Sequence, residues 1–159
     1  MLVKIMKTLI ICFSYHHKNT EKIASIFSKI LDAEVKTPVE VDPNRLSDYN
    51  LIGFGSGIAF GKHHKVMLDF ADKLPKETGK KAFIFSTSGQ TDNGPKFHKN
   101  LREKLESKGF GIVGEFNCAG FDTFAFLKIV GGIQKGHPND DDINQAEVFA
   151  QSLKLPEKT

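Results

Sequence analysis

Apolar residues gather in short runs that alternate along the chain with amphipathic stretches. Several of these runs are nearly uninterrupted and rich in β-branched residues and phenylalanine, which is typical of strands buried on both faces of a sheet. Strands are predicted at Lys7–Phe13, Glu34–Thr37, Leu51–Gly55, Lys81–Ser86 and Phe110–Cys118. The second strand is the shortest, and Pro38 ends it because proline cannot donate to a strand ladder.

Between the strands, apolar residues recur at the three- and four-residue spacing of a helix face. This spacing predicts helices over Asn19–Asp32, from about Lys65 to Leu74, around Phe97 to Leu105, and after Asp140–Asp142. Short polar side chains suit the start of the first helix, and the aspartates place negative charge at the start of the last. The stretch 39–49 carries Pro43 and is predicted to be irregular, with at most one helical turn.

Strands and helices alternate in an order that requires a parallel sheet with right-handed crossovers and helices on both faces. We therefore predict an α/β fold, a doubly wound three-layer sandwich whose five-stranded sheet has the order 2-1-3-4-5. The 159 residues fit one domain that spans residues 1–159. Met6 stands just before the first strand, so residues 1–5 are a candidate disordered leader.

In such a sheet, ligands bind beyond the carboxyl ends of the strands, near the point where the winding direction changes. Three loops are expected to meet there, namely Ser14–Thr20, Ser56–His63 and Thr87–Gly94. All three are rich in hydroxyls, amides and glycines, whereas the strands that precede them are apolar. This contrast predicts a binding site at the rim of the sheet.

The first of these loops has the chemistry of an anion receptor. It opens a helix, whose free backbone N–H groups and positive dipole end favour a phosphate. Ser14, Asn19 and Thr20 add short polar donors, and His16–Lys18 add positive charge. The alternative is that Asn19 and Thr20 only cap the helix, which would leave the other donors of the loop unexplained.

Nearly the whole chain resembles the flavodoxin family, and the likeness is clearest around these loops. The run Ile11–Ala24 (ICFSYHHKNTEKIA) is similar to the family's phosphate loop, which starts at a strand-end serine or threonine and closes with Asn-Thr-Glu. Tyr49–Lys62 (YNLIGFGSGIAFGK) and Lys81–Gly89 (KAFIFSTSG) resemble the third and fourth strands of the family together with the loops that follow them.

The resemblance implies a flavodoxin-like fold that binds FMN, with the phosphate in the first loop and the isoalloxazine ring between the other two. By this resemblance the phosphate would be held by Ser14, His16, His17, Lys18, Asn19 and Thr20. The ring would be held by Ser56, Gly57, Ile58, Ala59, Phe60, Gly61, Ser86, Thr87, Ser88 and Gly89.

The chain departs from the family pattern at several of these positions. The first loop is longer than usual, and His17 and Lys18 stand where small residues are common. Phe60 either covers one face of the ring or packs against the following helix, whereas Thr87–Gly94 holds no aromatic residue. Gly57 is either a hinge beside the ring or part of a tight turn.

Composition narrows the choice of function. The formal net charge of +3 is spread along the chain, which argues against a nucleic-acid partner, and no apolar run is long enough to span a membrane. The two cysteines, Cys12 and Cys118, cannot form a disulfide framework or a zinc site, so we expect a cytoplasmic protein. The adjacent histidine pairs lack metal-ligand spacing, and His98 is expected on the solvent side or at the edge of its helix stripe.

Three functions stay open on the sequence alone. The favoured one is an FMN-binding electron-transfer protein that serves external redox partner proteins. The second is an FMN-dependent NAD(P)H or quinone reductase, which an open ring face and a basic charge would favour because hydride donors are anionic and stack on the ring. The third is a cofactor-free binding or regulatory module. Whether the chain is an enzyme and what its oligomeric state is are not decided by these patterns.

Overall fold

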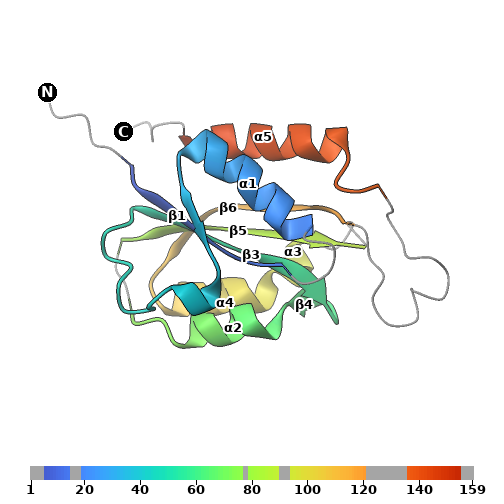
Figure 1. Cartoon of the computed structure of the whole chain (residues 1–159). Coiled ribbons are helices and arrows are strands. Elements are labelled where there is room, and N and C mark those ends of the chain that lie inside the picture. The colour runs from blue at the N-terminus through green and yellow to red at the C-terminus, as the bar shows by residue number, and fades with distance from the viewer. Residues whose placement is uncertain (1–5, 15–18, 77–78, 90–93, 121–135, 155–159) are drawn as a thin grey trace, which may run out of the picture.

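In the computed structural model, which describes residues 6–14, 19–76, 79–89, 94–120 and 136–154, a parallel sheet lies between two layers of helices (Figure 1). The helices are α1 (Asn19–Leu31), α2 (Lys65–Asp72), α3 (Gly94–Phe97), α4 (Lys99–Ser107) and α5 (Asp140–Lys154), with one 3-10 turn, η1 (Pro38–Glu40). Helices α1 and α5 cover one face of the sheet, and α2 and α4 cover the other. The predicted three-layer arrangement is confirmed.

The sheet has the predicted doubly wound topology. Its strands are β1 (Thr8–Phe13), β2 (Glu34–Lys36), β3 (Leu51–Ala59), β4 (Lys62–His63), β5 (Lys81–Ser88) and β6 (Gly111–Ala119). The five main strands run parallel in the order β2-β1-β3-β5-β6, which is the predicted order 2-1-3-4-5 once the short β4 is set aside.

The sequence placed the end of the third parallel strand too early. It predicted a strand over Leu51–Gly55 followed by a loop, but β3 continues to Ala59. Parallel pairing with β1 and β5 continues the strand through Ser56 and Gly57. The short β4 then folds back and pairs antiparallel with the last two residues, with Ile58 opposite His63. The second predicted loop is therefore a β-hairpin.

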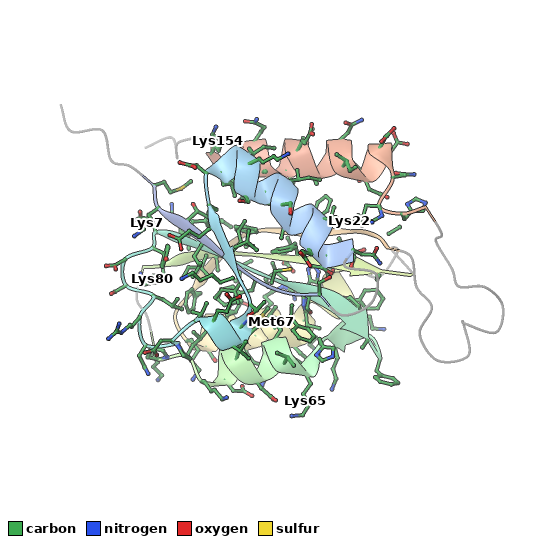
Figure 2. All side chains as sticks on the ribbon, in the orientation of Figure 1. Lys7, Lys22, Lys65, Met67, Lys80 and Lys154 are labelled. Atoms are coloured by element: carbon green, nitrogen blue, oxygen red, sulfur yellow. The ribbon has the colours of Figure 1, made fainter. Side chains whose placement is uncertain are left out.

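Side chains fill the space on both sides of the sheet (Figure 2). Helix α2 shows how the pattern directs them: Met67 points toward the sheet and is fully buried, whereas Lys65 points into solvent. On the opposite face, α1 places Phe27 edge-on against Phe83 and Phe85, with ring centroids 5.7 and 5.1 Å apart. Each face thus has its own apolar core.

Glycines in β3 make room for these phenylalanines. A Cβ at Gly55 would stand 2.2 Å from carbons of the Phe85 ring, and a Cβ at Gly53 would stand 2.3 Å from Phe83. Phe83 and Phe85 belong to β5, and their rings lie over the adjacent strand β3, so β3 needs residues without side chains at these two positions.

The two cysteines, Cys12 on β1 and Cys118 on β6, are buried free thiols, and burial raises the pKa of each to about 12. None of the helices described is both long and apolar enough to cross a membrane.

Candidate functional site

The carboxyl ends of β1, β3 and β5 meet at one edge of the sheet, on the right in Figure 1, where α1 also begins. Parallel register brings them level: Phe13 pairs with Ser56, and Ser56 pairs with Ser86. The structure thus brings the described parts of the three sequence-predicted loops together at this rim. Of the predicted residues, His16, His17 and Lys18 lie outside the described part of the chain.

The described residues at the two ends of the first loop, Ser14, Asn19 and Thr20, make close contacts with the rest of the structure. Ser14 Oγ accepts a hydrogen bond from the Glu21 N–H at 3.4 Å. Thr20 is buried, and its Oγ1 lies 2.8 Å from Thr87 Oγ1, which joins the start of α1 to the end of β5. Asn19 packs so closely on Gly120 that a Cβ at Gly120 would stand 2.8 Å from the Asn19 amide nitrogen. These contacts aim the N-terminus of α1 at the rim.

The second loop is a tight hairpin with an aromatic tip. Phe60 and Gly61 are the two turn residues, and their φ angles of 55° and 75° are both positive, as a type I′ turn requires. Ile58 and Ala59 precede them on the strand and are half-buried. Phe60 is 86% exposed, so it does not pack into the core against α2. Together with Lys62, Leu68 and Lys104, it borders an open hollow beside α2 and α4.

At the base of this hairpin, Ser56 is fully buried and turned away from solvent. Its Oγ lies 2.7 Å from His63 Nδ1 and accepts from the His64 N–H at 3.1 Å. The next residue, Gly57, has open surroundings, because a Cβ there would meet only Thr20 Oγ1, at 3.9 Å. The Ser56 hydroxyl therefore braces the hairpin, while the Gly57 backbone borders the rim.

A second serine–histidine pair, Ser86 and His98, lies directly below the third loop. Ser86 is fully buried, and its Oγ lies 2.6 Å from His98 Nε2 and accepts from Asn117 Nδ2 at 2.7 Å. Asn117 Nδ2 also reaches Ser88 Oγ at 3.2 Å. Thr87 and Ser88, predicted as ring contacts, are buried at the end of β5, and Gly89 follows them half-buried.

His63 and His98, the histidines of the two serine–histidine pairs, are in contact with each other. Their ring centroids are 5.0 Å apart, and His98 Nδ1 lies 3.0 Å from Glu115 Oε1. Burial lowers the pKa of His63 well below its usual value, and the neighbouring His98 lowers it further. Burial also lowers the pKa of His98, although Glu115 acts in the opposite direction. We call Ser56, His63, Ser86, His98, Glu115, Asn117 and Arg102 the polar cluster.

The sequence did not reveal this cluster, and its expectation for His98 was wrong. His98 is 1% exposed, because it sits at the break between α3 and α4, where the chain turns its side chain under β5. Its partners Ser86 and Glu115 are 12 and 17 residues away, so no local spacing joins them. The available signals were Glu115 and Asn117, two polar residues in a predicted strand. In the described part of the chain, no three His, Cys, Asp or Glu side chains gather as a metal site would need.

Comparison with known proteins extends this description. A family model described as a flavodoxin domain matches residues 10–120. An uncharacterized protein of Methanocaldococcus jannaschii is 53% identical over 148 residues, which cover 93% of this chain and 98% of that protein. The crystal structure of oxidised flavodoxin 2 from Bacillus cereus has a TM-score of 0.68 at 19% identity, and covers 92% of this chain and 96% of its own. A Fusobacterium nucleatum flavodoxin bound to flavin mononucleotide has a TM-score of 0.66 at 14% identity, over 94% and 98% of the two chains.

Proposed function

This chain belongs to the flavodoxin family, and from that premise we propose that it binds FMN at the rim and carries electrons between external redox proteins. The observation that carries the proposal is the convergence of three family loops on one edge of the sheet, with the N-terminus of α1 aimed at it.

The described residues fit the phosphate of FMN. Helix α1 has 13 residues, so its first turn offers backbone N–H groups with the positive end of a full helix dipole behind them. The Ser14 hydroxyl accepts from the Glu21 N–H of that turn, and the Thr20 hydroxyl belongs to the turn itself. This donor set suits a small dianion better than an apolar ligand, and we assign it the phosphate.

The described residues also fit a flat ring. The backbone at Gly57 and the β5 end at Thr87–Gly89 border the rim from two strands, and Phe60 supplies an exposed aromatic surface. Bound FMN would supply the electron chemistry itself. The chain would bind and orient the ring, and Phe60 would shield one of its faces from water.

A reductase is the second candidate, and one observation favours it. The third loop offers Thr87, Ser88 and Gly89 but no aromatic side chain among its described residues, so on that side nothing described covers the ring. An uncovered face would admit the nicotinamide of NADH or NADPH. The carrier is preferred because the family model that matches the chain describes a flavodoxin domain.

Titration of the purified protein with FMN and with riboflavin tests the proposal, followed by flavin absorbance and fluorescence quenching. We expect one FMN per chain and much weaker binding of riboflavin, which lacks the phosphate. The variant Thr20→Val should weaken FMN binding roughly 10- to 100-fold, the effect of one hydrogen bond to a charged group. It should change riboflavin binding far less, and Ser107→Ala, an exposed position at the end of α4, is the matched control.

Each outcome has a definite meaning. Absence of binding at micromolar FMN would refute both flavin functions and leave a cofactor-free module. Equal affinity for FMN and riboflavin would refute the assignment of the first loop. Rapid bleaching of the bound flavin by NADH or NADPH alone would replace the carrier with the reductase.

A further inference from the structure

A continuous line of hydrogen bonds joins the third loop to a carboxylate at the surface. It runs from Ser86 Oγ to His98 Nε2 at 2.6 Å, and from His98 Nδ1 to Glu115 Oε1 at 3.0 Å. Ser86 and His98 are 0% and 1% exposed, whereas the Glu115 side chain is 27% exposed. A change of charge beside Thr87 and Ser88 therefore acts on an imidazole that is hydrogen-bonded to a carboxylate.

The partners of His98 fix where its hydrogen lies. Burial acts to raise the pKa of Glu115, but two hydrogen bonds from Arg102, both at 2.9 Å, together with its charge, lower that pKa. Glu115 is thus ionised and can only accept, so neutral His98 carries its hydrogen on Nδ1. His98 Nε2 then accepts from the Ser86 hydroxyl, which itself accepts from Asn117 Nδ2.

The same residues can satisfy a protonated His98. Asn117 Oδ1 is buried and has no hydrogen-bond partner in the described structure. When His98 Nε2 carries a hydrogen, it donates to Ser86 Oγ, and the Ser86 hydroxyl must turn to a new acceptor. A half-turn of the Asn117 amide places Oδ1 where Nδ2 now faces Ser86, and provides that acceptor. In both protonation states the Ser86 hydroxyl then has one donor and one acceptor, and in the second state Asn117 Nδ2 gives up its bond to Ser88 Oγ.

The charged groups around His98 differ from those around the neighbouring His63. The groups that face His98 are His63 from β4, Glu115 from β6 and Arg102 from α4, while β5 contributes only the Ser86 hydroxyl. Glu115 and Arg102 cancel each other, so protonation leaves one net positive charge beneath the third loop. His63 is fully buried beside His98 and has no carboxylate partner in the described structure, so a second proton on the pair is disfavoured.

We propose that His98 takes up one proton from solvent when FMN bound at the rim is reduced, and that this proton offsets the negative charge gained there. The inference rests on the proposed function. Full reduction takes two electrons from external donor proteins. With one proton from solvent on the flavin, one negative charge remains at the rim, and a second proton from solvent forms the N–H bond at His98 Nε2. Reduction and protonation are thereby coupled through Ser86, without contact between His98 and the cofactor.

Protein carrying 15N-labelled histidine tests the proposal by NMR, because imidazole nitrogen shifts report both tautomer and protonation. Spectra are compared for the apo-protein and for the FMN-loaded protein, oxidised and fully reduced, across a pH series. We expect His98 to be neutral with its hydrogen on Nδ1 in the apo and oxidised states. Its titration midpoint should move to higher pH on reduction, while His63 stays neutral throughout and serves as the internal control.

Variants provide a second readout, the proton uptake that accompanies reduction in weakly buffered solution. His98→Gln should lose the part of the uptake that the wild type shows in the pH range where His98 titrates. Glu115→Gln should move that range to lower pH, and Glu103→Gln, an exposed position on α4, should leave it unchanged. Flavin absorbance verifies loading in every sample.

The outcomes separate this inference from the function on which it rests. If FMN binds and the His98 titration is the same in oxidised and reduced protein, the inference is wrong and the proposed function stands. If FMN does not bind, both are wrong. The wild-type NMR comparison decides even where a variant fails to fold.

Discussion

Replacing Gly55 by alanine should destabilise the protein sharply, whereas the same change two residues further along the strand should not. At Gly55 the new Cβ would overlap the Phe85 ring, with three ring carbons within 2.4 Å. At Gly57 the nearest atom is Thr20 Oγ1, at 3.9 Å, which is an ordinary contact. The two variants add the same methyl group to the same strand and differ in what it meets.

The size of the effect follows from how little Phe85 can move. Relief of the overlap needs a shift of about 1 Å to reach ordinary contact near 3.4 Å. Phe85 is fully buried, with Phe27 edge-on at 5.1 Å and Phe83 stacked at 5.9 Å, so the strain spreads into the core. Overpacking of this kind costs about 1–3 kcal/mol. For a chain of this length each kcal/mol lowers Tm by roughly 2–4 °C.

Urea and thermal unfolding, followed by circular dichroism, measure the difference. Gly57→Ala should be neutral or more stable by up to about 1 kcal/mol, because alanine reduces the entropy of the unfolded chain. Adding Phe85→Leu to Gly55→Ala should recover part of the loss, with a favourable coupling of about 0.5–3 kcal/mol in a double-mutant cycle. Equal stability of Gly55→Ala and Gly57→Ala, or zero coupling, would refute the reasoning.

Further predictions concern the polar cluster and the thiols. Ser86→Ala should cost about 1–3 kcal/mol in urea unfolding, because buried partners of its hydroxyl lose a hydrogen bond. Burial lowers the pKa of His63 and His98 from 6.5, so the unfolded chain binds protons at higher pH than the folded chain. Stability should therefore fall as pH decreases below about 6.5, and His63→Asn should flatten that dependence. Cys12 and Cys118, whose pKa burial raises to about 12, should resist a thiol reagent at pH 8 until the protein is unfolded.

Each of these has an outcome that contradicts it. An Ser86→Ala variant as stable as the wild type would mean that its partners find water in place of the hydroxyl. A flat stability profile between pH 7.5 and 5.5 would mean that the histidines are not held neutral. Prompt labelling of the native thiols would place at least one of them in contact with solvent.

The sequence predicted the fold well where one residue pattern has one structural meaning. Short apolar runs rich in aromatic residues, such as Lys81–Ser86, favour buried strands, and their alternation with helices leaves few topologies. The positions of the three loops followed from that topology, because polar residues directly after buried strands must lie at one rim. Phe60 was left between two roles, and the structure rules out the packed one, since the residue is 86% exposed.

The rest depends on contacts between distant residues, which no periodicity encodes. The hairpin beyond Gly55 forms because β4 returns to pair with β3, and its turn residues are not the Asn-Gly pair that would announce it. His98 was expected on the solvent side or at the edge of its helix stripe, because its partners Ser86 and Glu115 come from two other elements. Positions that look permissive locally, such as Gly55, are restricted by a ring from the neighbouring strand.

At the tip of the hairpin, the residue that would be best for stability differs from the residue that is present. A type I′ turn places both of its residues in the left-handed region, where Asn-Gly is favoured and a phenylalanine costs about 1–2 kcal/mol. Phe60 holds that conformation, with φ at 55°. Random mutagenesis scored by heat resistance should therefore enrich Phe60→Asn, whereas the same library scored by electron transfer should retain the aromatic ring. A protein engineer who optimised this fold for stability alone would remove the exposed aromatic ring that we propose as the cover of the flavin.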